Sequence, residues 1–299
     1  MTAAVAISTW LSRVSGRQFA AAAAAEVGGG SIHRCVRWRG EGGDAFVKLA
    51  AADTLPAFEA EAEGLQALAE AGALRVPAVL AVGEAGGHAL LALEWLDFQP
   101  ATESDGALQA QLGERLAMQH RATAPRFGWH RDNTIGATPQ QNAWDDDWVQ
   151  FFRERRLGVQ LDLAARNGLG PHGVDRGRDL AERCGAFFSS YRPVPSLLHG
   201  DLWGGNWGSV AGVGEPAVFD PAVYYGDREA DLAMTRLFGG FGPRFYAAYQ
   251  SAWPLDQAAG TRRTLYNLYH VLNHFNLFGG GYGRQAEGMI DRLLAEFGA

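Results

Sequence analysis

The pattern of apolar and polar residues changes its period near residue 96. Before this point, alternating segments at 31–39 and 45–49 flank one glycine-rich turn, and segments at 78–83 and 88–95 flank another. Alternation with a period of two residues on both sides of such a turn predicts a β-hairpin in each case.

A helix is predicted between the two hairpins. Thr54 can cap its start, and a glycine at position 72 marks its end. Its apolar positions share one helical face and are Phe58, Leu65 and Leu68. The predicted order of elements before residue 96 is therefore strand, strand, helix, strand, strand.

Beyond residue 96 the apolar positions recur with the helical period. The pattern predicts helices over residues 105–123, 144–165, 175–191, 228–237, 243–252 and 260–277. The chain should therefore fold as an α+β protein with two lobes. Residues 1–96 should form a small antiparallel sheet with one helix, and residues 97–299 a larger, mainly helical lobe.

Composition limits the classes of partner. A chain of 299 residues with 47% hydrophobic content can bury a substantial core. Its formal net charge is −7, and it has no run of Lys and Arg. Nucleic acids and anionic membranes are bound through basic surfaces, so the charge argues against both.

The N-terminal segment does not have the pattern of an export signal. Arg13 and Arg17 interrupt it, and the alanine run at 20–25 is too short to span a membrane. A cytoplasmic protein is therefore expected. In that reducing compartment Cys35 and Cys184 should be free thiols, and neither has zinc-ligand spacing.

Candidate chemistry lies in the segment His199–Asn206, which reads HGDLWGGN. In ATP-dependent phosphotransfer one Asp orients the acceptor hydroxyl and takes its proton, while an Asn and a later Asp hold magnesium at the phosphates. Asp201 and Asn206 have the spacing of the first pair, and Asp220 follows after room for a short hairpin. Asp201 is thus the candidate catalytic residue, and Asn206 and Asp220 are the candidate Mg²⁺ ligands for bound ATP.

The same residue types also cluster in ordinary turns, which is the alternative interpretation. If the segment is catalytic, its surroundings differ from those of a protein kinase, which has an Arg before the catalytic Asp and an activation segment after the metal-binding Asp. Gly200 stands at the Arg position, and a helical pattern begins at Arg228, soon after Asp220. The expected acceptor is therefore a small molecule, or a small group displayed on a larger one.

The first lobe should supply the rest of the nucleotide site. A glycine run lets backbone N–H groups approach phosphates, although it can also be a plain turn; here it is Gly28, Gly29 and Gly30. Lys48 ends the second strand and should bind the phosphates, with Glu61 on the next helix as its ion-pair partner. The backbone of Glu94, Trp95 and Leu96, at the junction of the lobes, should bind the adenine.

The chain resembles the fructosamine kinase (ketosamine-3-kinase) family, within the wider group of aminoglycoside-phosphotransferase-like kinases. The predicted order strand, strand, helix, strand, strand is that of a kinase N-terminal lobe, so a protein-kinase-like two-lobe fold is expected. The matching segments extend over nearly the whole chain and are Phe58–Leu65, Phe127–Gly136, Trp144–Leu157, His199–Asn206, Asp220–Phe241 and Leu265–Leu277. Some relatives have a Cys directly after the glycine run, where this chain has Ser31. Redox control by this loop is therefore in doubt here.

The resemblance implies transfer of the ATP γ-phosphate to the 3-hydroxyl of a ribulosamine- or fructosamine-type ketoamine. The adduct would be carried by a small amine or by a protein lysine, and it would break down once phosphorylated, so that the activity is deglycation. The resemblance leaves open which sugar is preferred, whether the substrate is free or protein-bound, and the oligomeric state.

An acceptor of this kind needs an apolar face and hydrogen-bonding groups. Four side chains could provide them, although each Trp could equally fill a core: Trp203, Trp129, Asn133 and Trp144. Asp231 is expected to be a buried brace for the catalytic loop. His199 and His120 are expected to be structural.

Two other functions stay open. A kinase for another hydroxylated amine, such as choline or an aminoglycoside, would use the same phosphate machinery. The family-like segments 127–157 and 220–241 argue against this choice. A catalytically silent nucleotide-binding protein would not need Lys48, Asp201 and Asp220 together.

Overall fold

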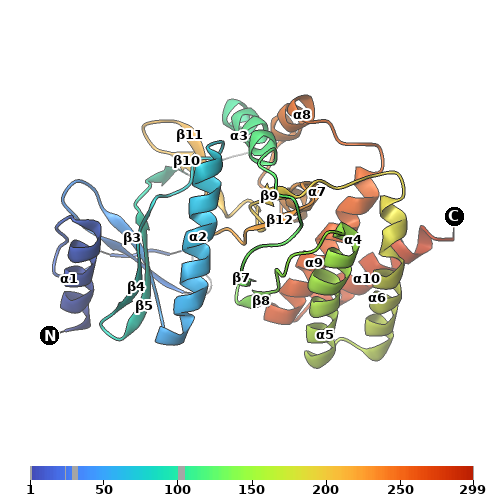
Figure 1. Cartoon of the computed structure of the whole chain (residues 1–299), viewed down its shortest axis with the longest axis horizontal. Helices are drawn as coiled ribbons and strands as arrows, with labels where there is room; N and C mark the ends of the chain where they lie inside the picture. Colours follow the sequence, from blue (N-terminus) through green and yellow to red (C-terminus); the bar gives the residue numbers. More distant parts are fainter. Residues whose placement is uncertain (1, 24, 29–32, 100–104, 299) are drawn as a thin grey trace.

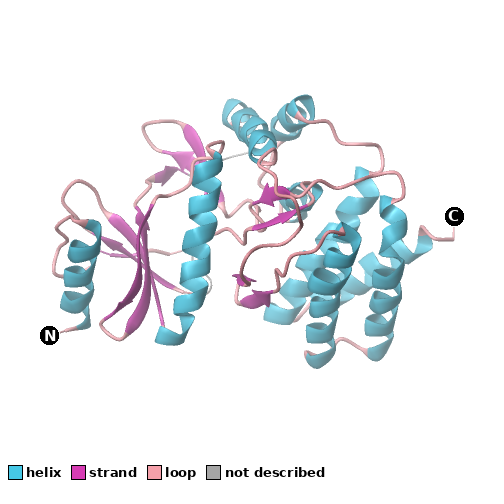
Figure 2. Ribbon diagram, viewed as in Figure 1, coloured by secondary structure: helices cyan, strands magenta, loops and turns pink. Residues whose placement is uncertain are grey.

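Two lobes lie side by side in the computed structural model, which describes residues 2–23, 25–28, 33–99 and 105–298 (Figure 1). Strands gather in the N-terminal lobe and long helices in the C-terminal lobe (Figure 2). The protein-kinase-like two-lobe arrangement predicted from the sequence is confirmed. A lobe boundary at residue 96 stays a prediction, and Gly29, Gly30 and Ser31 lie outside the described residues.

The N-lobe is built on a five-stranded antiparallel sheet with the strand order β1-β2-β3-β5-β4. The strands are β1 (Ala25–Glu26), β2 (Arg34–Trp38), β3 (Ala45–Ala50), β4 (Val79–Ala85) and β5 (His88–Glu94). Helix α2 (Leu55–Ala71) covers one face of this sheet and presents Phe58, Leu65 and Leu68 to the core. Both predicted hairpins and the helix between them are therefore present.

A second helix, α1 (Ala3–Ser15), covers the opposite face of the sheet and corrects the prediction of a single N-lobe helix (Figure 1). Thr2 caps it by accepting a hydrogen bond from the Val5 N–H. Its buried residues Ile7, Trp10 and Leu11 form a separate core with the outer face of the sheet. The spacing of these three residues is that of one helical face, which is the signal for this helix in the sequence.

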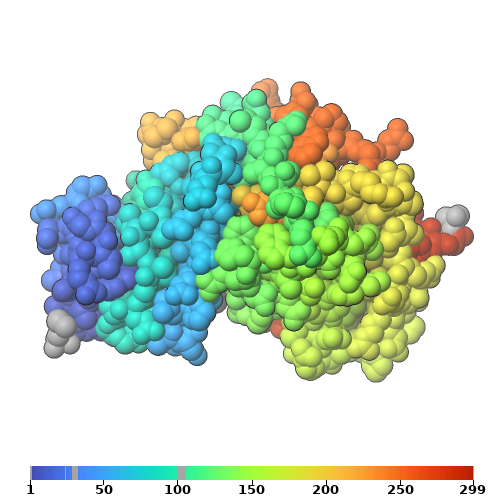
Figure 3. All heavy atoms as spheres, in the orientation of Figure 1, coloured from blue at the N-terminus to red at the C-terminus, as the bar shows by residue number. Residues whose placement is uncertain are grey.

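The C-lobe contains the helices predicted from residue 105 onward. They are α3 (Gly106–Gln119), α4 (Trp148–Phe152), α5 (Val159–Arg166), α6 (Pro171–Arg183), α7 (Glu229–Leu237), α8 (Pro243–Ala252), α9 (Ala259–Phe278) and the unpredicted α10 (Tyr282–Ala295). A π-helical segment joins α4 to α5, and 3-10 turns occur at Ala52–Thr54 and Cys184–Phe188. In the face shown in Figure 3, the green and yellow segments around α4, α5 and α6 form much of the C-lobe surface.

Short strands hold the loops between the lobes. Strands β9 (Ser196–Leu198) and β12 (Tyr224–Gly226) pair on either side of the catalytic segment, and β10 (Trp207–Val210) and β11 (Glu215–Val218) form the hairpin expected before Asp220. The remaining strands are β6 (Phe98–Gln99), which pairs with β10, and β7 (Asn133–Ile135) with β8 (Thr138–Gln140).

No helix in the described part of the chain is long and apolar enough to cross a bilayer.

Candidate active site

The segment after β9 brings Asp201 and Asn206 together. The side-chain amide of Asn206 donates to the Asp201 backbone oxygen at 2.8 Å and lies 3.3 Å from its carboxylate oxygen Oδ2. The same amide is 3.5 Å from the backbone oxygen of Asp220. The spacing seen in the sequence therefore places all three residues in one cluster.

Asp231 holds the backbone of the catalytic segment, as expected. It is 1% exposed and accepts hydrogen bonds from the N–H groups of His199 at 2.7 Å and Gly200 at 2.8 Å. His120 Nε2 lies 3.1 Å from the same carboxylate. Burial alone would raise the pKa of Asp231, but the hydrogen bond and charge of His120, with the loop N–H groups, outweigh it and lower this pKa.

Gly200 explains why no Arg precedes Asp201. Its φ is +82°, and a Cβ at this position would lie 2.0 Å from the backbone oxygen of Ala222. Only glycine fits such a contact without moving the backbone. His199 has the predicted structural role, because its Nε2 lies 3.0 Å from the Phe219 backbone oxygen.

Lys48 is the buried cation of the site. Its Nζ lies 2.7 Å from Glu61 Oε1, which is the predicted ion pair, and 2.8 Å from Asp220 Oδ1. Burial alone would lower the pKa of Lys48, but the charges of Glu61 and Asp220 raise it well above its usual value. The ammonium is therefore charged at neutral pH and is fixed between the two lobes.

The electrostatic setting of Asp201 suits proton transfer. Burial, and after it the negative charge of Asp220, raise the pKa of Asp201 to about 7, although the Asn206 hydrogen bond opposes the change. A carboxyl group whose pKa lies near the working pH can accept a proton from a hydroxyl group efficiently.

Asp220 itself has a φ of +56°, an unusual backbone conformation for a residue other than glycine that is often found at functional sites.

Asn206 and Asp220 fit the chemistry of a magnesium site. Mg²⁺ is commonly held by one or two carboxylates and by substrate phosphates, with oxygen atoms as its ligands. Asn206 turns its amide nitrogen toward Asp201, so its carbonyl oxygen can serve as a ligand beside the Asp220 carboxylate. Within the described ranges no cluster of three His, Cys, Asp or Glu side chains could hold a metal, so phosphate oxygens and water molecules would complete the coordination.

The expected adenine-binding segment is held mainly by N-lobe contacts. The Glu94 N–H donates to Ala78 O at 2.8 Å and the Trp95 N–H to Asp44 O at 3.2 Å. The Glu94 carboxylate binds Arg75 at 2.6 Å. Contact of the Glu94–Leu96 backbone with adenine stays a prediction, and Gly28 is exposed at the edge of the sheet.

Trp203 has an open aromatic face next to Asp201. Its side chain is 39% exposed, and its ring covers Gly205, where a Cβ would come within 2.2 Å of the ring. Phe238, after α7, meets this ring edge-on at 6.3 Å, and His274 on α9 lies 4.6 Å from Phe238. No spacing in the sequence relates Phe238 and His274 to the catalytic segment, so neither is predicted as a site residue from the sequence.

The other three predicted acceptor residues contact the segment around β12. Asn133 donates to Val223 O at 2.8 Å, and its oxygen accepts from Gln140 and Asn142. Trp129 and Trp144 pack on Tyr225, with ring centroids 5.5 and 6.1 Å away. These contacts give all three a structural role, and their contact with an acceptor stays a prediction.

Comparison with known proteins identifies the family of the chain. A sequence profile of the fructosamine kinase family matches residues 3–296. The chain belongs to the fructosamine kinase family. It is 43% identical over 290 residues to a probable ketoamine kinase of Synechocystis, covering 96% of both chains. It is also 42% identical over 272 residues to the chloroplastic protein-ribulosamine 3-kinase of Arabidopsis thaliana, covering 90% of this chain and 81% of the relative.

Solved structures agree with this family assignment. A protein of Thermobifida fusca assigned as a fructosamine-3-kinase has a TM-score of 0.84 and 31% identity, with 97% of this chain and 98% of that chain covered. An aminoglycoside phosphotransferase in complex with ADP and hygromycin B has a TM-score of 0.60 at 15% identity, covering 97% of this chain and 98% of that chain. The second comparison shows a shared fold alone.

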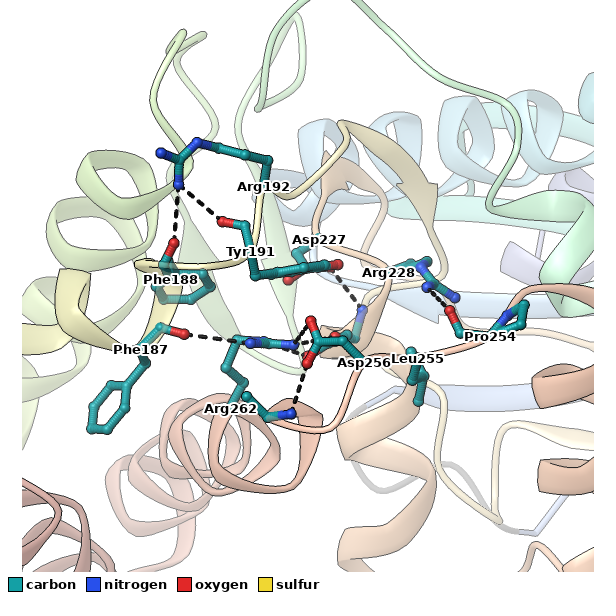
Figure 4. Close-up of polar contacts among 12 residues, drawn as sticks. Phe187, Phe188, Tyr191, Arg192, Asp227, Arg228, Pro254, Leu255, Asp256 and Arg262 are labelled. Atoms are coloured by element: carbon teal, nitrogen blue, oxygen red, sulfur yellow. Dashed lines mark hydrogen bonds and ion pairs between the residues drawn. The ribbon is translucent and has the colours of Figure 1, made fainter.

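A buried polar network anchors the start of α7, the helix that carries Asp231 (Figure 4). Arg262 binds Asp256 at 2.7 Å and both oxygens of Glu229 at 2.8 Å. Arg228 donates to the backbone oxygens of Trp253 and Pro254 at 2.8 and 2.6 Å. In this fructosamine kinase family member the network ties the α8–α9 connection to the helix beneath the catalytic segment.

Proposed function

We propose that this protein transfers the γ-phosphate of ATP to the 3-hydroxyl of a ketoamine, a ribulosamine- or fructosamine-type adduct on an amine. The observation that carries the proposal is the cluster of Lys48, Asp201, Asn206 and Asp220 beside the exposed Trp203 face. The names of the similar proteins support the same class of acceptor.

In the proposed reaction each residue has a separate part. Asp201 accepts a hydrogen bond from the 3-hydroxyl and takes its proton as the oxygen attacks the γ-phosphorus. Lys48, aimed by Glu61, binds the α and β phosphates, and the backbone near Glu94 holds the adenine. Trp203 packs on the C–H surface of the sugar.

Magnesium held by Asn206 and Asp220 would neutralise charge on the β and γ phosphates. Lys48 would then exchange its contact with Asp220 for the phosphates, while Glu61 remains its second partner. The protein therefore contributes mainly positioning and charge, as phosphoryl transfer requires.

The products would be ADP and a 3-phosphorylated ketoamine that breaks down and releases the amine. The substrates would thus be glycated small molecules or glycated protein lysines, and the activity would be deglycation. A cytoplasmic location stays a prediction from the sequence.

The test is ATP-dependent phosphorylation of a panel of free and peptide-bound ribulosyl- and fructosyl-lysines, with choline and an aminoglycoside as comparison acceptors. Phosphate should be found on carbon 3 of the ketoamine sugar, and Asp201→Asn should abolish most of the signal. Faster phosphorylation of choline or the aminoglycoside than of every ketoamine would overturn the proposal.

A further inference from the structure

A basic concavity lies between α9 and α10, beside the last residue of α7. It has a volume of about 420 Å³, and its polar lining consists of Arg263, Thr264, Asn267, Arg284, Gln285 and Arg292. Thus three arginines from two antiparallel helices face one small space. None of the residues given a part in the proposed reaction lines this concavity.

The three arginines are not neutralised by neighbouring carboxylates. In the described part of the chain, Arg263, Arg284 and Arg292 take part in no ion pair within 4.0 Å. The acidic residues of α10 point toward α6 instead: Asp291 binds Arg176 at 2.7 Å, and Glu287 lies against Gly173. A local excess of positive charge in a chain of net charge −7 attracts an anionic partner.

Asn267 supplies a second and independent observation. It is 8% exposed, it lines the concavity, and its side-chain oxygen is buried with no hydrogen-bond partner in the described structure. A buried acceptor without a donor is destabilising, so a hydrogen-bond donor bound in the concavity would stabilise it. An inorganic phosphate dianion has no strong donor to offer, whereas a peptide carries an N–H group at almost every residue.

Ring contacts connect the candidate active site with the helix that lines the concavity. Asn267 and His274 lie seven residues apart on one face of α9, roughly 10 Å along the helix axis. His274 contacts Phe238, which contacts Trp203 beside Asp201. Leu237, which precedes Phe238 in the chain, itself lines the concavity. A row of rings therefore leads from the catalytic segment to α9, the helix that also carries Arg263 and Asn267.

We propose that the concavity binds an acidic stretch of polypeptide next to a glycated lysine. This inference rests on the proposed function and specifies its substrate as protein-bound. The ketoamine sugar lies at Asp201, the lysine side chain runs along the rings of Trp203, Phe238 and His274, and neighbouring Asp or Glu side chains reach the arginines. Asn267 accepts a hydrogen bond from the N–H of the bound peptide.

The experiment compares two peptides that carry the same ketoamine-lysine, one flanked by Asp and Glu and one by Asn and Gln. For the parent protein, kcat/KM should be about tenfold or more higher for the acidic peptide, mainly through KM. In the triple variant Arg263→Gln, Arg284→Gln, Arg292→Gln the ratio should fall to within about twofold of one. A ratio near one in the parent, or an unchanged ratio in the variant, would overturn the inference.

A matched control carries Arg13→Gln, Arg166→Gln and Arg178→Gln, three exposed arginines elsewhere, and has the same net charge as the first variant. It should keep the preference of the parent. If it loses the preference equally, overall charge and not the concavity is responsible, and the inference fails. Thermal unfolding of both variants checks that they are folded.

A binding measurement separates this inference from the proposed function. The unglycated acidic peptide, labelled for fluorescence anisotropy, should bind the parent about tenfold more tightly than the first variant. If no ketoamine is phosphorylated but this difference is present, the proposed function fails and the peptide site stands. Absence of the difference, or tighter binding of single-stranded RNA than of the peptide, would refute the peptide site.

Discussion

The Nζ atom of Lys48 lies 2.8 Å from Oδ1 of Asp220, a residue 172 positions later in the chain. One ammonium thus joins the N-lobe sheet to the loop that follows the β10–β11 hairpin. Because Glu61 holds the same ammonium at 2.7 Å, carboxylates from both lobes position the lysine. The contact brings the predicted phosphate-binding and metal-binding residues into one site.

Glu61→Gln should weaken ATP binding about tenfold, because the amide keeps the size of the side chain but loses the charge that fixes Lys48. The readout is the Kd for ATP from a titration. Glu59→Gln is the matched control, since Glu59 lies on the same helix and its nearest cation, Arg131, is 3.6 Å away. Equal losses in both variants would contradict the role of Glu61.

Asp220→Asn should remove most of the magnesium dependence of nucleotide binding. The carboxylate is the charged ligand of the proposed pair, and an amide binds Mg²⁺ much more weakly. ATP titrations with and without Mg²⁺ should differ about tenfold or more in the parent and little in the variant. The same magnesium dependence in both proteins would exclude Asp220 as a ligand.

Asp201→Asn should reduce kcat by about two to four orders of magnitude while the Kd for ATP stays nearly constant. An amide can still contact the acceptor hydroxyl but cannot take its proton. Steady-state kinetics and nucleotide titration together test this separation. Turnover within a few-fold of the parent would remove Asp201 from the role of base.

Contacts between site residues could be predicted from the sequence where the residues lie close together in the chain, because the chemistry then requires a particular spacing. Asp201 and Asn206 share a loop, and Lys48 and Glu61 share a hairpin and its following helix, so their contacts could be predicted. The row of rings from Trp203 through Phe238 to His274 could not be predicted from the sequence, because it depends on how α7 and α9 pack. The positive φ of Asp220 likewise arises from tertiary structure and leaves no mark on residue type.

Trp203→Ala should raise KM for a ketoamine-lysine by about tenfold or more, since about 1 to 3 kcal/mol of apolar contact is lost. The KM for ATP should change much less. Trp203→Phe keeps an aromatic face and should restore most of the affinity. Parallel changes in both KM values would instead indicate that the catalytic segment itself had moved.

His270 makes the stability of the protein depend on pH. It is 4% exposed on α9, and burial, followed by the charge of His274, lowers its pKa from 6.5 to about 3. The folded state therefore resists protonation that the unfolded chain accepts. The contribution of neutral, buried His270 to the free energy of unfolding is fully present above pH 6.5, and it is lost progressively as the pH falls toward 3.

At pH 5.5 the free energy of unfolding should be lower by about 1.4 kcal/mol than at pH 7.5 or above because of His270. Urea unfolding of the parent and of His270→Gln at pH 7.5 and 5.5 measures it, because subtracting the two proteins cancels the other titrating groups. His172→Gln, which removes an exposed histidine, is the control. The parent should lose more stability than His270→Gln on acidification, and equal losses would show that His270 is protonated in the folded protein as readily as in the unfolded chain.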